Sequence, residues 1–182
     1  MILFVTSNSH KFQEIRELLK QYGIEIEWMN IKYEEIQAST TEEISADSAH
    51  KLASLIKRPF FIEDTGLYIE ALNGFPGPYS SYVFSSIGNK GILKLLDGIG
   101  RNAEFRTVIT YFDGAQYFQF TGKLHGTIAD RERGNSGFGY DPIFIPDGGK
   151  ETLGEMDLSQ KNLISHRASA ARLFADYIKG PR

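Results

Sequence analysis

Apolar and polar positions alternate at two different spacings along the first part of the chain. A short apolar run at 2–5 predicts a buried strand. Apolar residues at helical spacing over 12–22 then predict a helix, which Gly23 would end. Strict alternation over 24–28 predicts a second, half-exposed strand. The chain therefore begins as strand, polar turn, helix and strand.

The next segment repeats this order of elements. Thr40 and Glu43 have the spacing of a capping box, so we expect a helix from there to about Lys57. The apolar run over 59–64 predicts a buried strand that ends in two adjacent carboxylates. Because neighbouring side chains of a strand point to opposite faces, the two acids cannot point the same way. At least one of them should face a cleft.

The second half of the chain combines long strands with turn-rich loops. Aromatic and β-branched residues over 105–112 and 116–128, separated by Asp113-Gly114, predict a long antiparallel hairpin. Clusters of turn-forming residues predict shaped loops at 73–79 and 134–142. These segments form a β-meander rather than further strand–helix units.

Two more helices complete the pattern, a short one over 89–96 and a closing one over 159–179. Strand–helix alternation followed by a meander predicts an α/β fold with a mixed central β-sheet flanked by helices. We expect a two-lobed single domain with a cleft, spanning residues 1–182. Functional loops should gather where the strands of the sheet end.

Composition narrows the classes of partner. The 182 residues suit one well-buried domain. Lys and Arg total 20 against 23 Asp and Glu, a net charge of -3, so the chain has no broad positive field for nucleic acid. Any phosphate ligand must be held locally. The sequence contains no cysteine, which excludes disulfides, thiolate nucleophiles and sulfur-ligated metals.

The sequence also bears on localisation. No apolar run approaches the length that spans a membrane. The start, MILFVTSN, has only a short apolar run and no basic leader, so it is typical of a first strand rather than of a signal peptide. We therefore expect a cytoplasmic protein with neither a membrane nor a nucleic-acid partner.

The loop after the first strand, TSNSHK, carries donors suited to a polyphosphate. Backbone N–H groups at a helix N-terminus have partial positive charge, and hydroxyl, amide and ammonium groups add further donors. Alternatively, Ser7 or Ser9 only caps the helix and Lys11 is a solvated surface residue. The candidate phosphate-binding residues are Thr6, Ser7, Asn8, Ser9, His10 and Lys11.

Four carboxylates are candidates for metal binding and catalysis: Glu34, Glu35, Glu63 and Asp64. Magnesium is usually held by one or two carboxylates together with phosphate oxygens of the substrate, and a further carboxylate can deprotonate a water. Alone, Glu34 and Glu35 are also typical of a solvated loop. Asp64 follows a buried run, so we expect it to face the cleft, with Glu63 on the opposite side of the strand.

The loop SGFGYDP over 136–142 could bind a planar base. Phe138 and Tyr140 flank Gly139 and could present ring faces, while Asp141 could accept a hydrogen bond from a ring N–H. Glycine would let the ligand approach the backbone. The alternative is that both aromatic side chains pack in the core and that Asp141 only begins a turn.

A cationic cluster precedes the closing helix. Lys161, Ser165, His166 and Arg167 could donate hydrogen bonds to base carbonyls or to phosphate. Alternatively, the cluster is surface charge on a helix. The remaining histidines have no metal-ligand spacing, so we assign them no metal.

Six segments taken together resemble one family. They are SNSHK, YEEIQ, FIEDTG, NGFPGPYS, GFGYDPIF and KNLISHRASA, in this order over nearly the whole chain. In this order they are similar to the Ham1-like inosine triphosphate pyrophosphatase family. The resemblance implies hydrolysis of inosine, deoxyinosine and xanthosine triphosphates to monophosphate and pyrophosphate, with Mg2+, by a homodimer that cleans the nucleotide pool.

The resemblance also implies roles for individual residues. It implies that Asp64 is the catalytic acid and that Asp64 and Glu35 are metal ligands. It also implies that the TSNSHK loop binds the triphosphate. Ser9 and His10 stand where a glycine is common in the family, so their phosphate contacts do not follow from the resemblance. The remaining substrate contacts that it implies are Thr65, Phe138, Gly139, Tyr140, Asp141, Lys161, His166 and Arg167.

Two other functions fit parts of the sequence. A Maf-like pyrophosphatase would act on pyrimidine or modified triphosphates. Activity over a panel of nucleoside triphosphates separates it from an inosine triphosphate pyrophosphatase. A non-catalytic nucleotide or single-strand binding module would use Phe138 and Tyr140 for stacking. The acid set argues against that module, because carboxylates repel phosphate unless a metal lies between them.

Overall fold

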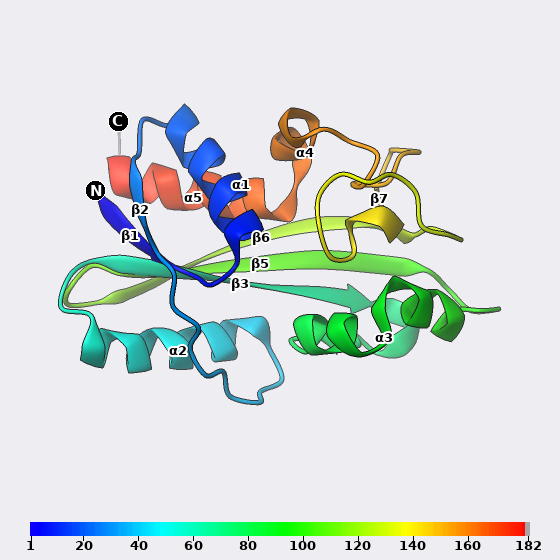
Figure 1. The fold of residues 1–182 in the computed structure, drawn as a ribbon, viewed down its shortest axis with the longest axis horizontal. Helices are drawn as coiled ribbons and strands as arrows, with labels where there is room; N and C mark the ends of the chain where they lie inside the picture. The colour runs from blue at the N-terminus through cyan, green and yellow to red at the C-terminus, as the bar shows by residue number, and fades with distance from the viewer. Residues whose placement is uncertain (181–182) are drawn as a thin grey trace. The chain divides into compact units, whose positions relative to one another are not determined.

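A computed structural model describes residues 1–180 and contains a mixed β-sheet flanked by helices (Figure 1). The sheet order is β2-β1-β3-β5-β6-β7, with β4 paired to β3. β1 pairs in parallel with β2 and β3, whereas β3–β4 and β6–β7 are antiparallel. The predicted mixed sheet is confirmed. The strands are β1 Ile2–Val5, β2 Ile26–Met29, β3 Phe60–Ile69, β4 Pro76–Gly77, β5 Asn102–Phe112, β6 Tyr117–Ile128 and β7 Phe144–Pro146.

The helices lie between and after the strands. The α-helices are α1 Ser9–Gln21, α2 Thr41–Leu55, α3 Ser80–Leu95, α4 Leu158–Ile164 and α5 His166–Lys179, and short 3-10 turns occupy Glu70–Leu72 and Asp141–Ile143. Within the described residues, no helix is long and apolar enough to cross a membrane.

The chain forms two compact units. Unit 1 contains Met1–Asp64, Thr107–Gly122 and the chain from His166 onward, and unit 2 contains Thr65–Arg106 and Lys123–Ser165. β3, β5 and β6 each contribute residues to both units. Two units agree with the two lobes expected from the sequence, while the cleft and the single-domain boundary 1–182 stay predictions.

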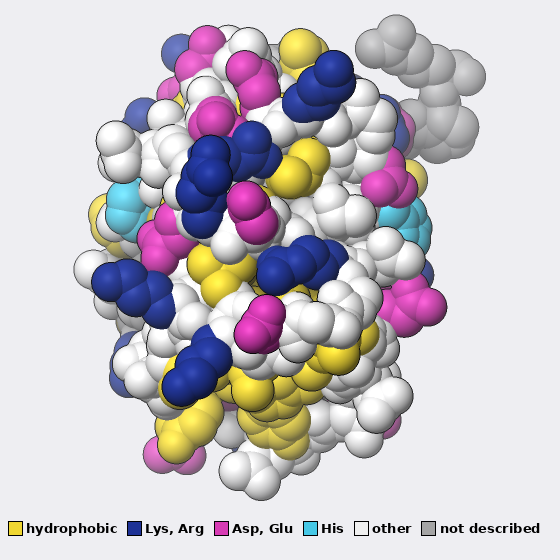
Figure 2. Space-filling view, turned by 90° about the vertical axis from the view of Figure 1, so that its right-hand side faces the viewer, with side chains coloured by type: hydrophobic (Ala, Val, Ile, Leu, Met, Phe, Trp, Pro, Cys, Tyr) yellow, Lys and Arg dark blue, Asp and Glu magenta, His cyan; other side chains and the backbone are white. Residues whose placement is uncertain are grey.

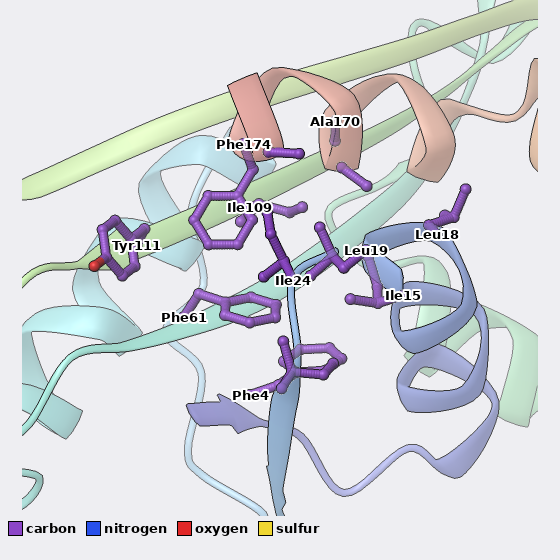
Figure 3. Close-up of a cluster of buried hydrophobic side chains, with 13 residues drawn as sticks. Phe4, Ile15, Leu18, Leu19, Ile24, Phe61, Ile109, Tyr111, Ala170 and Phe174 are labelled. Carbon is purple, nitrogen blue, oxygen red and sulfur yellow. The ribbon is translucent and has the colours of Figure 1, made fainter. Parts of the chain in front are cut away.

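The core of unit 1 lies between β-strands and the helices α1 and α5 (Figure 3). The rings of Phe4 and Phe61 stack with centroids 4.5 Å apart, and Phe174 of α5 packs on Phe61 at 5.0 Å. α2 covers the other face of these strands (Figure 1), where Leu52 joins a second apolar cluster. Unit 1 therefore has helices on both faces of its part of the sheet.

The N-terminus of α2 forms as the sequence predicts. The Thr40 side chain accepts a hydrogen bond from the backbone N–H of Glu43, and the backbone N–H of Thr40 donates to the Glu43 carboxylate at 3.1 Å. This reciprocal box satisfies two donors that a helix N-terminus otherwise leaves open. The predicted capping box is confirmed, although α2 ends at Leu55 rather than at Lys57.

β3 is longer than the strand predicted over 59–64, and it does not end at the two acids. It continues to Ile69 because Leu67 and the next residue pair with β4. The backbone N–H of Leu67 also donates to Ser80 Oγ at 2.7 Å. A side chain at Gly66 would collide with the carbonyl of Gly77 on β4, so glycine permits this pairing rather than ending the strand.

One helix prediction was incomplete and another was wrong in its boundaries. The short helix expected over 89–96 forms the second part of α3, which begins at Ser80 and is interrupted at Gly88, whose φ of 60° and ψ of -166° are not helical. The closing helix expected over 159–179 is divided into α4 and α5, because Ser165 is extended with ψ of 155°. In the closing segment apolar spacing continues across the backbone break at Ser165, which periodicity alone does not detect.

Unit 2 has its own core, formed mainly by β-strand residues and by one face of α3. Val83 and Ile92 of α3 are buried in it together with Phe105, Ile143 and Phe144. The opposite side of α3 is exposed. Figure 2 shows apolar side chains in yellow gathered in the lower half of the face that contains α3. The exposed large apolar side chains of α3 are Tyr82, Phe84, Ile87 and Leu95.

Candidate functional site

Asn8 organises the loop at the start of α1. Its Oδ1 accepts hydrogen bonds from the backbone N–H groups of His10 at 3.0 Å and Lys11 at 3.2 Å. Thr6 Oγ1 in turn accepts from the backbone N–H of Asn8 at 3.1 Å. The helix cap is therefore Asn8 and neither of the serines, Ser7 and Ser9, which are exposed. The loop places two exposed hydroxyls at the positive end of a helix dipole.

Lys11 is not a solvated surface residue. Its Nζ lies 2.7 Å from Oε2 of Glu63 and donates to the Glu63 main-chain carbonyl at 3.1 Å. The Lys11 side chain keeps 18% of its exposure, whereas the Glu63 side chain is fully buried. Alternation along β3 leaves the neighbouring Asp64 partly exposed. The two acids therefore have different surroundings, as the strand pattern predicts.

Arg167 completes a buried network of charges with the same carboxylate. Its Nε donates to Glu63 Oε1 at 3.1 Å, and its second terminal nitrogen lies 3.0 Å from that oxygen. Its other terminal nitrogen donates to Glu14 at 2.6 Å. Arg167 lies in the first turn of α5 and is 2% exposed. In this structure its guanidinium binds two carboxylates, and its predicted contact with a purine stays a prediction.

The packing of α5 on β6 fixes the position of Arg167. A side chain at Gly122 of β6 would collide with the carbonyl of His166 and the backbone nitrogen of Ala170. Glycine therefore lets the first turn of α5 lie directly on the strand. His166, also predicted as a substrate contact, is 2% exposed at this position. Both predicted residues of this turn lie inside unit 1 rather than on its surface.

Negative charge surrounds the phenol of Tyr33. Burial is the largest cause that raises the pKa of Tyr33 well above its usual value. Nearby negative charges raise this pKa further, and they belong to Asp64, Glu35 and Glu63. The phenol thus stays neutral at physiological pH. Glu35 of the loop and Asp64 of β3 thus both contribute negative charge at the Tyr33 phenol.

The donors suit magnesium better than a metal that needs an all-protein cage. Among the described residues, no group of three or more metal-ligating side chains is preformed. Magnesium needs only one or two carboxylates, because water and substrate phosphate supply its other ligands. Glu63 already binds Lys11 and Arg167. The fitting oxygen donors are therefore Glu35, which is exposed, and Asp64.

Unit 2 contains the predicted base-binding loop, which Asp141 and Lys161 hold together. Lys161 Nζ donates to Asp141 Oδ2 at 2.7 Å, with both side chains buried. The same oxygen accepts the backbone N–H of Phe138 at 2.8 Å. Lys161 Nζ also lies 5.1 Å from the centroid of the half-exposed Phe138 ring. This arrangement fixes one partly exposed ring beside a buried cation.

Tyr140 and Gly139 are held by α3. The Tyr140 hydroxyl donates to the Ser80 carbonyl at 2.8 Å, and burial raises the pKa of this phenol. Its ring lies edge-on to Phe84 and belongs to the core of unit 2. Asn89 Nδ2 donates to the Gly139 carbonyl at 3.2 Å. The structure thus supports the core alternative for Tyr140 and leaves Phe138 as the candidate stacking surface.

The structure therefore gathers the predicted residues in two groups. In unit 1 it brings together Lys11, Glu63 and Arg167, and the charges of Glu35 and Asp64 both act on Tyr33. In unit 2 it brings together the loop from Phe138 to Asp141 and Lys161. Thr65 is half-buried in the part of β3 that belongs to unit 2.

Three residues of these groups were missed by the sequence reading. Glu14 follows the buried stripe of α1, four residues before Leu18, so a carboxylate on an apolar helix face was an available signal. Tyr33 stands next to the acid pair, but nothing in its spacing indicates burial. Asn89 follows the break at Gly88, and only the backbone geometry brings its amide to Gly139.

Comparison with known proteins assigns the family. The model of the Ham1 family matches residues 2–177, and the chain belongs to this family. A protein of Methanopyrus kandleri called dITP/XTP pyrophosphatase is 49% identical over 180 residues, which cover 98% of this chain and 96% of that protein. A protein of the same name from Thermococcus kodakarensis is 49% identical, with 98% and 97% coverage.

Solved structures agree with the sequence comparison. The HAM1 protein from Coxiella burnetii matches with a TM-score of 0.84 at 31% identity, covering 98% of this chain and 99% of that one. The resemblance drawn from six short segments is confirmed, and so is the fold class.

Proposed function

We propose that this protein is a nucleoside triphosphate pyrophosphatase that converts ITP, dITP and XTP to the monophosphate and pyrophosphate. The observation that carries the proposal is 49% identity, over 98% of the chain, to a protein called dITP/XTP pyrophosphatase. The local structure supports it, because the chain has exposed hydroxyls at a helix N-terminus and the carboxylates of Glu35 and Asp64, which are the kind of ligand that Mg2+ takes. In line with the family resemblance, we also propose a cytoplasmic homodimer.

The phosphate end of the substrate is assigned to residues of unit 1. The exposed hydroxyls of Ser7 and Ser9 at the positive end of α1 donate to phosphate oxygens, with Lys11 adding a positive charge. Magnesium held by Glu35 and Asp64 would neutralise charge that develops on the leaving pyrophosphate. Asn8 keeps the loop in shape through its two hydrogen bonds.

Asp64 is assigned as the general base. Its carboxylate orients a water, accepts one proton from it, and the water oxygen forms a bond to the α-phosphorus as the bond to the bridging oxygen breaks. The products are the nucleoside monophosphate and pyrophosphate. Glu63 is not assigned as the base, because both oxygens of its carboxylate already pair with Lys11 and Arg167.

The base end of the substrate is assigned to residues of unit 2. Phe138 offers a ring for stacking, and Lys161 offers an ammonium that can only donate hydrogen bonds. Hypoxanthine and xanthine present a carbonyl at position six, whereas adenine presents an amino group. A buried donor that meets another donor costs roughly 1–3 kcal/mol, so adenine should be disfavoured. Thr65, Gly139, Tyr140 and Asp141 of unit 2 are further proposed substrate contacts, and so are His166 and Arg167 of unit 1.

We expect ITP, dITP and XTP to be turned over at least about tenfold more efficiently than ATP, because one unmatched buried donor is sufficient for that difference. Release of pyrophosphate, measured as kcat/KM over a panel of purine and pyrimidine triphosphates, tests this expectation. Equal values for ITP and ATP would contradict it. Preference for pyrimidine or modified triphosphates would instead favour a Maf-like activity.

A further inference from the structure

Glu63 is a buried carboxylate held between two cationic side chains of unit 1. Lys11 Nζ lies 2.7 Å from its Oε2, and Arg167 binds its Oε1 at 3.0 and 3.1 Å. Thr107 Oγ1 donates to the same Oε1 at 3.2 Å. A single carboxylate thus connects the first turn of α1, the middle of β5 and the first turn of α5.

Lys11 is the member of this group that reaches the surface. Its side chain keeps 18% exposure, while the side chains of Glu63 and Arg167 keep 0% and 2%. An ammonium group has three N–H donors. The group donates one hydrogen bond to the Glu63 main-chain carbonyl and forms an ion pair with the Glu63 carboxylate. These two contacts leave N–H donor capacity for an anion at the N-terminus of α1.

This arrangement has a consequence for phosphate binding. A lysine without an anchor samples many rotamers, and a ligand that orders it must offset the lost conformational entropy. Hydrogen bonds between charged partners are shorter and stronger than neutral ones, and burial of the carboxylate strengthens them further. Glu63 therefore fixes the ammonium before a ligand arrives.

We propose that Glu63 is a positioning residue that acts through Lys11: it holds the Lys11 ammonium ready for a phosphate oxygen and is not itself a metal ligand. The inference deepens the proposed function and rests on it for the identity of the anion. The two neighbouring acids then have different roles. Glu63 positions the Lys11 ammonium inside unit 1, and Asp64 acts as the general base and as a metal ligand. The strand's alternation is what separates the two roles.

A labelling experiment tests the anchoring without any assay of activity. Wild-type protein and Glu63→Gln are treated briefly with acetic anhydride, and acetylation of each lysine is followed by mass spectrometry. Lys20, which is exposed on the same helix, is the internal reference. We expect Lys11 to react severalfold faster, relative to Lys20, in Glu63→Gln than in the wild type. An unchanged ratio would overturn the proposal.

A double-mutant cycle tests whether Glu63 acts through Lys11 in catalysis. Glu63→Gln alone should lower kcat/KM for ITP by about tenfold or more, as loss of a charged hydrogen bond does. In a Lys11→Ala background the same change should alter kcat/KM by no more than about twofold, because the partner is already gone. Additive losses would contradict action through Lys11.

Two further measurements separate the alternatives. The Mg2+ concentration for half-maximal activity should be the same in Glu63→Gln as in the wild type, and a large increase would instead make Glu63 a metal ligand. If Glu63→Gln does not fold, Thr107→Val removes one hydrogen bond to Glu63 and should raise Lys11 labelling in the same direction. If wild-type protein releases no pyrophosphate from ITP, the proposed function fails, whereas the labelling result still decides the anchoring.

Discussion

Asp64→Asn is expected to lower the turnover of ITP by at least about 10²-fold, the lower end of what general-base catalysis contributes. The amide keeps the size of the side chain but cannot accept a proton from water, and it is a weaker ligand for a divalent cation. Asp64 is partly exposed, so the substitution should leave the unfolding midpoint nearly unchanged. The measurement is kcat from pyrophosphate release at saturating ITP and Mg2+.

A matched control for this variant is Asp176→Asn, which removes an exposed carboxylate from α5 in the same unit. Its turnover should equal that of the wild type. Turnover of Asp64→Asn within about twofold of the wild type would exclude Asp64 as the base, since even weak general-base catalysis contributes far more. Equal losses in both variants would point to a general effect of lowered negative charge.

Lys161→Ala is expected to have the largest effect on stability. It removes the cation that lies 2.7 Å from Asp141 and leaves a carboxylate with a 4% exposed side chain. Breaking a buried ion pair in this way typically costs about 3–5 kcal/mol. The free energy of unfolding, obtained from urea denaturation, should fall by that amount. Lys150→Ala, an exposed lysine of unit 2, should leave it unchanged.

A double substitution separates stability from activity at this pair. Lys161→Met with Asp141→Leu replaces both charges by apolar side chains of similar size, which often restores stability. Activity should not return, because Phe138 loses the acceptor of its backbone N–H and the proposed donor to the base is absent. Recovery of ITP hydrolysis in the double variant would show that Lys161 has only a structural role.

The elements that the sequence predicted well are those with local signals. Thr40 and Glu43 form the predicted capping box because the box needs only residues within one helical turn. Asp113 accepts hydrogen bonds from two following backbone N–H groups, so the hairpin turn also forms from local chemistry. The candidate acids, the loop before α1 and the base loop were proposed from short motifs taken together, and their functional roles stay predictions.

What the sequence did not predict depends on contacts between distant segments. β3 passes through its two acids because β4, formed by a loop that looks irregular, pairs with Leu67. Tyr140 is buried because its hydroxyl donates to the Ser80 carbonyl and its ring packs edge-on to Phe84, both on α3. Glu14 and Glu63 bind the same arginine from positions far apart in the chain. No periodicity carries such information, since it specifies a face of an element and not its neighbour.

We propose that acidic side chains and a triphosphate act together because a divalent cation joins them. The most direct test is pyrophosphate release from ITP by the wild-type protein with Mg2+, after its removal by a chelator, and after Mg2+ is restored. We expect hydrolysis with Mg2+, its loss in the chelator, and its return when Mg2+ is added again. Hydrolysis that continues at an unchanged rate in the chelator would contradict the account.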